Sequence, residues 1–73
     1  MTRSLNDTVT AEVRAELGRQ RMSGAELAKR LGVSGVWVSR RLSGHSPLTT
    51  DDLEAIAVIL DKSVHDFLPG RAA

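Results

Sequence analysis

Residues 31–44, with the sequence LGVSGVWVSRRLSG, hold the only tryptophan of the chain and two adjacent arginines. The stretch is too apolar for an ordinary loop, and its glycines lack the spacing of a phosphate-binding loop. Arginine can donate two hydrogen bonds to guanine O6 and N7, and an indole N–H can donate to a phosphate oxygen. These residue types therefore suggest contact with a polyanion rather than bond-making chemistry.

Catalysis or metal binding would have to use Asp51, Asp52 and Glu54, or the pair His45 and His65. The carboxylates cluster at the expected start of a helix, where the helix dipole favours negative charge. The two histidines are widely separated, and the chain has no cysteine and no HExxH spacing. We therefore expect no enzyme, no metal site and no cofactor.

The formal charge is unevenly distributed along the chain. The net charge is +1, but it divides into −1 over residues 1–13, +5 over 14–45 and −3 over 46–73. A basic middle segment followed by an acidic end is consistent with a polyanion bound on one side of the molecule.

Length and composition indicate one small helical protein. The 73 residues predict a single domain over 1–68 and a short disordered tail over 69–73. Its core must come from Leu, Val, Ile and Ala, since Trp37 and Phe67 are the only aromatic residues. The lack of cysteine, signal-peptide core and long apolar run predicts a cytoplasmic protein without membrane contact.

Capping residues and apolar spacing predict five helices and no strand, an all-α bundle. The first runs from about Asp7 to Gln20 behind an Asn6 cap, with an apolar stripe that starts at Leu5. The second lies between a Ser23 cap and Gly32, the third spans about 35–42, the fourth opens after Thr49 with a core stripe that reaches Leu60, and a short fifth lies within 63–68. Capping-box patterns are expected at Ser23 with Glu26, Thr49 with Asp52 and Ser63 with Asp66, and Gly32 and Gly44 are expected to end helices.

The helix over 35–42 has a narrow buried stripe. Successive helical residues turn by about 100°, so if Val38 points into the core, Leu42 lies beside it. Val36 and Arg40 then lie roughly 160° away and face outward. Trp37 is expected on one flank with Arg41, either as partly buried filler or as a contact to DNA or protein.

Two short helices joined by a tight glycine-containing turn, ELAKRLGVSGVWVSRRL, form a helix-turn-helix, whose second helix enters the DNA major groove. Here the sequence resembles the lambda-repressor and Cro-like (XRE-type) family of bacterial and phage DNA-binding proteins. The matching runs are S-x-A-E-L-A-x-x-L-G-V-S from Ser23, V-S-R-R-L-S-G from Val38, P-L-x-x-x-x-L-x-x-I-A-x-x-L from Pro47 and S-V-x-D-F-L from Ser63. The runs lie within 23–68, and the resemblance as a whole covers about residues 9–68.

The resemblance implies base reading by Gly35, Val36, Ser39 and Arg40. Arg40 suits guanine, and Val36 suits only a thymine methyl or exclusion by shape. Contacts to the DNA backbone are implied for a larger set: Ser23, Gly24, Trp37, Arg41, Ser43, His45, Ser46 and Arg21. Arg19, Lys29 and Arg30 can supplement them, although each alone is better explained as a solvated charge. Leu42 replaces the Glu of many relatives, which predicts apolar packing between 35–42 and the first helix.

We therefore expect a sequence-specific double-stranded DNA-binding transcriptional regulator, a repressor or Cro-like protein without a small-molecule ligand. A homodimer is the expected state on DNA, and whether it also exists off DNA is left open. Phe67 and Leu68 either form the dimer contact or complete the small core. The alternative is a helix-turn-helix-like protein-interaction module, such as an antitoxin or antirepressor partner, that uses the Trp37 and Val36 surface.

Overall fold

The computed structural model describes residues 4–69 and is helical throughout, with no strand in that range. The elements, in chain order, are α1 (Leu5–Arg19), α2 (Gly24–Leu31), α3 (Gly35–Leu42), α4 (Thr50–Leu60) and the 3-10 turn η1 (Val64–Phe67). The predicted all-α class is confirmed, but the predicted fifth helix is wrong, because η1 has only four residues. Leu68 is extended (φ −93°, ψ 144°), as expected for a residue before proline, and this conformation stops the helix.

The first helix begins two residues earlier than predicted. Ser4 is its N-cap, and the Ser4 Oγ accepts a hydrogen bond of 3.1 Å from the backbone N–H of Asp7. Asn6, the predicted cap, instead accepts a 3.0 Å hydrogen bond from the Leu48 N–H through its side-chain oxygen. Leu5 is 59% exposed and does not belong to the core stripe that begins at Val9.

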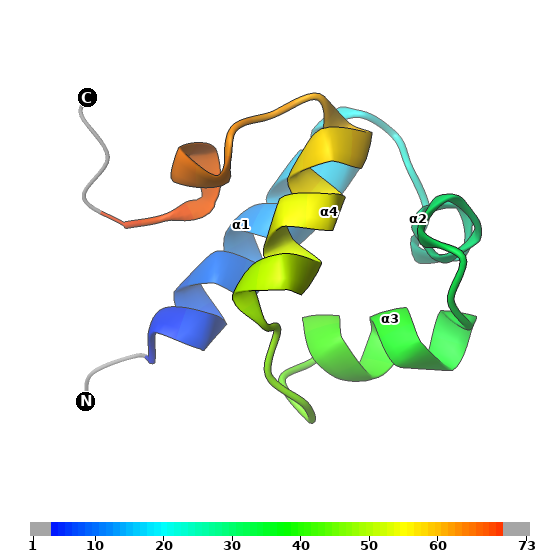
Figure 1. Cartoon of the computed structure of the whole chain (residues 1–73), viewed down its shortest axis with the longest axis horizontal. Helices are drawn as coiled ribbons and strands as arrows, with labels where there is room; N and C mark the ends of the chain where they lie inside the picture. Colours follow the sequence, from blue (N-terminus) through cyan, green and yellow to red (C-terminus); the bar gives the residue numbers. More distant parts are fainter. Residues whose placement is uncertain (1–3, 70–73) are drawn as a thin grey trace.

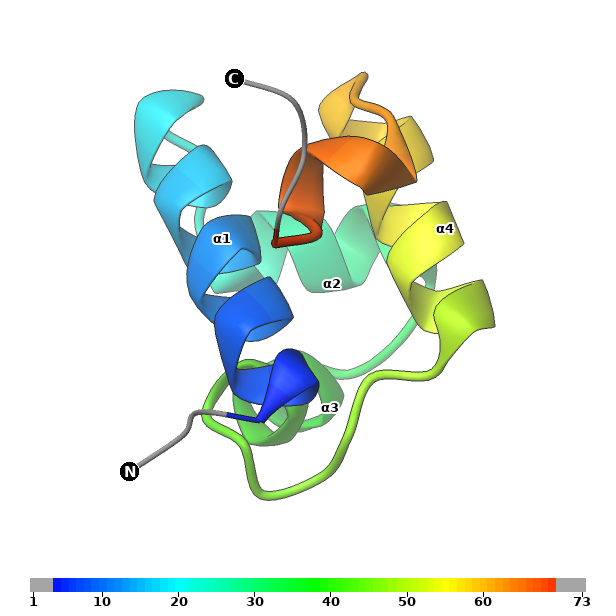
Figure 2. The same ribbon diagram turned by 90° about the vertical axis from the view of Figure 1, so that its left-hand side faces the viewer.

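The helices enclose the core from several directions. Figure 2 shows α1 and α4 on either side of α2, with η1 between their upper parts and α3 below, and Figure 1 shows α2 and η1 on opposite sides of α1 and α4. Contacts join α3 to both α1 and α2, and η1 to both α1 and α4. Helix α3 therefore lies at one edge of the bundle, with one side packed and the other free.

The core consists of aliphatic side chains and one aromatic ring. Its largest fully buried members come from all parts of the chain: Phe67, Leu27, Ile56, Leu60 and Val13. Phe67 is 1% exposed, so of the two roles expected for it, dimer contact and core residue, the structure supports the second. Leu68, which shares these two expected roles, is half-buried.

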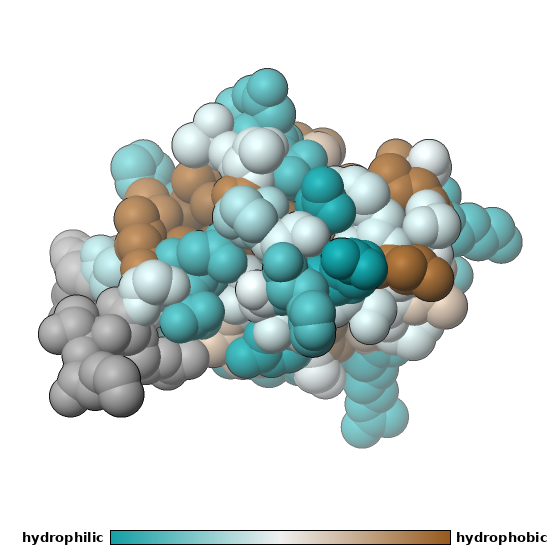
Figure 3. Space-filling view, turned by 90° about the horizontal axis from the view of Figure 1, so that it is seen from below, coloured by the Kyte–Doolittle hydropathy of each residue, from teal (hydrophilic) through white to brown (hydrophobic). Residues whose placement is uncertain are grey.

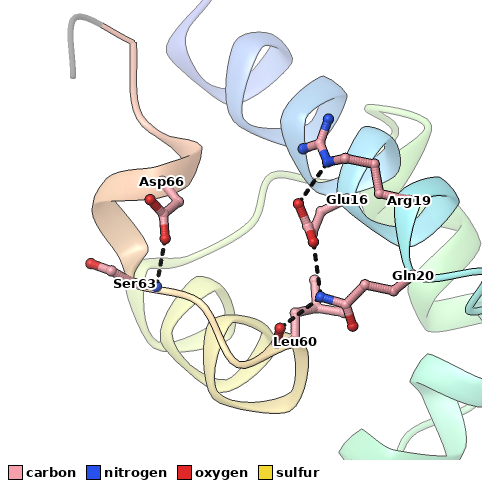
Figure 4. Close-up of polar contacts among 6 residues, drawn as sticks. All are labelled: Glu16, Arg19, Gln20, Leu60, Ser63 and Asp66. Carbon is pink, nitrogen blue, oxygen red and sulfur yellow. Dashed lines mark hydrogen bonds and ion pairs between the residues drawn. The ribbon is translucent and has the colours of Figure 1, made fainter. Parts of the chain in front are cut away.

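A buried carboxylate connects α1 to the end of α4 (Figure 4). Glu16 accepts hydrogen bonds from Gln20 Nε2 at 2.9 Å and from Arg19 Nε at 2.8 Å. The same Gln20 amide donates to the Leu60 carbonyl at 2.7 Å, one of the terminal carbonyls of α4. The bond from Gln20, followed by that from Arg19, holds the pKa of Glu16 below its ordinary value.

The predicted caps are largely confirmed. Complete capping boxes are present at Thr49 with Asp52 and at Ser63 with Asp66. Figure 4 draws one bond of the second box, from the Ser63 N–H to the Asp66 carboxylate. Ser23 accepts from the Glu26 N–H at 3.0 Å, but the Glu26 carboxylate accepts from Arg30 Nε at 2.8 Å. That capping box is therefore only half formed, because Arg30 competes for the carboxylate and lowers the pKa of Glu26. Of the predicted tail, Pro69 is exposed and residues 70–73 lie outside the described part.

Candidate nucleic-acid interface

A tight turn joins α2 to α3. Gly32 has φ +75° and ψ 31°, a left-handed conformation that favours glycine. The Val33 N–H donates to the Ala28 carbonyl at 3.0 Å and the Gly32 N–H to that of Lys29 at 3.2 Å, which together form a Schellman motif. Ser34 then caps α3 by accepting a 3.0 Å bond from the Trp37 N–H. Only three residues, 32–34, thus separate α2 from α3, as the sequence predicts.

Helix α3 presents one face to the core and the other to solvent. Val38 and Leu42 are 2% and 9% exposed, which confirms the predicted buried stripe. Gly35, Val36, Ser39 and Arg40 are all exposed, so the structure brings the four predicted base-reading positions onto one free surface. We call these four residues the reading face. Viewed from the α3 side, the molecule is mostly hydrophilic or neutral, with small separate apolar areas (Figure 3).

Trp37 and Arg41 form a stacked pair on the flank of α3. The Arg41 guanidinium carbon lies 4.1 Å from the centroid of the indole ring, in cation–π geometry. Arg41 Nε also lies 3.7 Å from Asp52 Oδ2, too far for a hydrogen bond, and this buried nitrogen has no other partner. Trp37 is half-buried and packs against the core, so its expected role as filler is met while its outer edge remains accessible.

The loop after α3 is ordered by backbone hydrogen bonds. Gly44 has φ +89°, and the His45 N–H donates 2.9 Å to the Arg40 carbonyl, which closes a second Schellman motif. Ser43 Oγ lies 2.9 Å from His45 Nδ1 and donates to the Arg40 carbonyl at 3.2 Å. Ser43 and His45 are exposed and Ser46 is half-buried. These three residues, which are predicted to contact the DNA backbone, therefore lie together in the loop that follows the reading face.

A polar contact holds the end of α3 against α1. Arg14, in α1, donates from Nη1 to the backbone carbonyl of Leu42. Leu42 is buried in the core, as the predicted apolar packing requires, and the arginine adds a polar contact to a main-chain oxygen that any residue at position 42 would offer. Arg14 also lines an open hollow with Ser39, Leu42 and Ser43. Sequence reasoning missed Arg14, since its partner is a backbone atom 28 residues away.

The remaining predicted contacts lie at or before the start of α2. Ser23, Gly24 and Arg21 are exposed, and the N-terminal amides of α2 point out of the helix in the direction that favours an anion. A Cβ at Gly24 would lie 3.7 Å from Val38 Cγ1, so Gly24 lies directly beside the buried face of α3. Of the supplementary cations, Arg19 and Arg30 pair with Glu16 and Glu26 on their own helices, while Lys29 is exposed.

Other site types find little support in residues 4–69. No group of three or more His, Asp or Glu side chains there could hold a metal ion. None of the helices in the same range is long and apolar enough to cross a membrane. An apolar groove between the N-terminal ends of α1 and α4 is lined by Leu5, Val9, Leu48, Leu53 and Leu68, among others.

Comparison with known proteins places the chain in a class. A family model described as a helix-turn-helix domain matches residues 10–67, and the protein belongs to this family. The structure is similar to the crystal structure of the clp gene regulator ClgR from C. glutamicum, with a TM-score of 0.84. The two chains are 23% identical, and the match covers 90% of this chain and 86% of that chain, so the likeness is one of fold. No curated protein matches the sequence.

Proposed function

We propose that the protein binds double-stranded DNA sequence-specifically, with α3 in the major groove. The observation that carries this proposal is the reading face, which holds an arginine, a hydroxyl and a valine on the free side of a helix fixed by a helix-turn-helix. In such motifs the N-terminal part of the second helix contacts base edges. Arg40 is the principal reader, since its exposed guanidinium can donate two hydrogen bonds to one guanine.

Contacts to the DNA backbone would hold α3 in register. Phosphate and sugar contacts fix the orientation of a protein on the duplex without reading sequence. We assign them to Ser43, His45 and Ser46 after α3, to Trp37 and Arg41 on its flank, and to Ser23, Gly24 and Arg21 at the start of α2. These groups lie before, along and after α3 in the chain, as expected if they contact successive phosphates.

We further propose that binding regulates transcription, with repressor or Cro-like action. The structural match to a protein described as a gene regulator supports the regulatory role. A two-fold dimer on half-sites about one helical turn apart is the arrangement expected for a helix-turn-helix module. The apolar groove that includes Leu5 and Leu68, rather than the buried Phe67, is the surface available for that contact.

The alternative, a protein-interaction module that uses Trp37 and Val36, has less structural support. Trp37 is half-buried and its ring is covered by Arg41, so Val36 alone remains as a well-exposed apolar side chain on α3. One isolated valine is a small surface for a protein partner, because protein interfaces are centred on larger apolar clusters.

Selection of bound duplexes from a random pool tests the proposal. Wild type should enrich a motif, and Arg40→Ala should lose discrimination at one position by about 5- to 150-fold, the effect of a bidentate base contact. Lys62→Ala, which removes an exposed cation after α4, is the charge-matched control and should select the wild-type motif. A motif unchanged by Arg40→Ala would remove Arg40 from base reading.

Salt dependence separates the two candidate functions. If about four phosphates are contacted per subunit, affinity should fall with a log–log slope of about −3.6. That slope is equivalent to a loss of affinity of roughly 150-fold between 50 and 200 mM salt. Failure to enrich any duplex, together with a protein partner whose affinity is insensitive to salt, would favour the interaction module.

A further inference from the structure

Val36 is unusual among the apolar residues of α3 because it is placed in solvent. Within residues 4–69 the large hydrophobic side chains that are well exposed are Leu5 at 59%, Val36 at 66% and Val58 at 74%. Val36 is the second residue of α3, directly after Gly35. It therefore lies at the end of the helix that would penetrate deepest into a major groove.

Val36 and Val58 are equally apolar but have opposite electrostatic surroundings. On the surface of a helix, the nearest neighbours of a residue are three and four positions away. For Val36 these neighbours include Ser39 and Arg40, a formal charge of +1. For Val58 they include Glu54, Asp61 and Lys62, two negative charges and one positive, a formal charge of −1. A phosphate-bearing partner is attracted to the first valine and repelled from the second.

The side chain of Val36 has no polar atom with which to bind a base edge. The apolar group that base pairs present in the major groove is the 5-methyl of a pyrimidine, carried by thymine. A Cβ added at Gly35 would meet nothing within 4 Å, and Gly35 has no side chain to hold a base edge away. The first turn of α3 can therefore approach the floor of the groove closely enough for Val36 to touch a methyl group.

We propose that Val36 is a specificity-determining residue that recognises a pyrimidine 5-methyl group in the major groove. This inference rests on the proposed DNA-binding function. Val36 and Arg40 are one helical turn apart, about 6 Å along the axis, and base pairs are spaced about 3.4 Å. The methyl group therefore belongs to a base within about two base pairs of the guanine that Arg40 contacts.

The expected effect follows from the burial of one methyl group. Removing a single buried carbon of this kind changes affinity by about fourfold, equivalent to about 0.8 kcal/mol. A two-fold complex with two such contacts would show the square of this factor, about sixteenfold, if the half-sites contribute independently.

The test uses the duplex that the full chain selects from a random pool. Each thymine near the Arg40-dependent position is replaced in turn by deoxyuridine, which retains base pairing and lacks the methyl group. Wild type and Val58→Ala should lose about fourfold in affinity per half-site at one position, and Val36→Ala should lose nothing there. Val58→Ala makes the same side-chain change at an equally exposed helical site, so it controls for helix propensity.

A second arm distinguishes thymine from methylated cytosine as the source of the methyl group. The sensitive T·A pair is replaced by C·G and by 5-methylcytosine·G. If wild type binds the 5-methylcytosine duplex better than the C·G duplex by a similar factor, and Val36→Ala does not, the methyl group alone is recognised. If wild type binds well only to the thymine duplex, the methyl group is recognised together with the rest of the base.

The proposal is overturned if no deoxyuridine substitution weakens wild type, or if Val36→Ala is weakened equally. In either case the selected motif and its dependence on Arg40 would leave the proposed DNA-binding function standing. If no duplex is selected at all, both proposals fail together.

Discussion

Replacing Arg41 by methionine should leave stability almost unchanged, although it removes two attractive contacts. The side chain of Arg41 is 25% exposed. Its stack on Trp37 therefore contributes about 1 kcal/mol, between the values for exposed and for desolvated cation–π pairs. The Asp52 pair at 3.7 Å adds about 0.5 kcal/mol. Opposing both, the buried Nε has no hydrogen-bond partner and costs about 1–3 kcal/mol.

Since these contributions nearly cancel, Arg41→Met should lie within about 1 kcal/mol of wild type. Methionine keeps the packing of the aliphatic stem on the indole, whereas Arg41→Ala removes that stem and should be about 1–2 kcal/mol less stable than Arg41→Met. The control is Arg40→Met, which makes the same change of charge at an exposed site on the same helix and should stay within about 0.5 kcal/mol.

Urea unfolding followed by far-ultraviolet circular dichroism measures these differences. Trp37 fluorescence is a second probe, because Trp37 is the only tryptophan and its emission should change in Arg41→Met but not in Arg40→Met. If Arg41→Met were destabilised by more than about 2 kcal/mol, the stack and ion pair would outweigh the cost of the buried Nε, and this reasoning would be refuted.

Three further outcomes are expected. Because hydrogen bonds from Gln20 and Arg19 lower the pKa of Glu16 in the folded state, its ionised carboxylate stabilises the fold at pH values above the ordinary pKa of the group. Wild type should be more stable to unfolding than Glu16→Gln by about 1–2 kcal/mol at pH 7, and this difference should disappear as the pH falls through the pKa of Glu16 in the folded state. A difference in stability that stays constant in acid-unfolding curves would contradict this expectation. Gly44→Ala should lower the free energy of unfolding by about 1 kcal/mol, because Gly44 has φ +89°. Gly18→Ala should raise it by about 0.5–1 kcal/mol, because the new Cβ would meet nothing within 4 Å. Equal shifts of the two melting temperatures would show that the backbone φ does not matter. Arg14→Met should lower the free energy of unfolding in urea by about 1 kcal/mol, because it removes the hydrogen bond to the Leu42 carbonyl. An unchanged free energy of unfolding would mean that water replaces this bond without cost.

Local signals in the sequence predict most of the helical framework. Ser34, Gly32 and Thr49 act on backbone groups within a few residues, so the end of α2 and the starts of α3 and α4 can be read without knowledge of the tertiary structure. The orientation of α3 follows from the same kind of information, because Val38 fixes the rotation of a short helix. The reading face is therefore largely predictable from the sequence.

The features that the sequence did not predict depend on partners distant in the chain. Asn6 is a good N-cap residue by type, but its side chain binds the Leu48 N–H, and Ser4 caps α1 instead. The Arg14 bond to the Leu42 carbonyl joins residues that have no local relation and involves a backbone atom that leaves no trace in residue identity. Such contacts become visible only once the helices are packed.

Chemical-shift titration of the isotope-labelled protein with its selected duplex tests the central claim most directly. The backbone amides of Gly35, Val36, Ser39 and Arg40 should shift strongly, while those around Glu54 and Val58 on the acidic outer side of α4 should stay in place. Unmoved amides in α3 alongside shifts around α4 would mean that DNA binds elsewhere, and the proposed mode of recognition would be wrong.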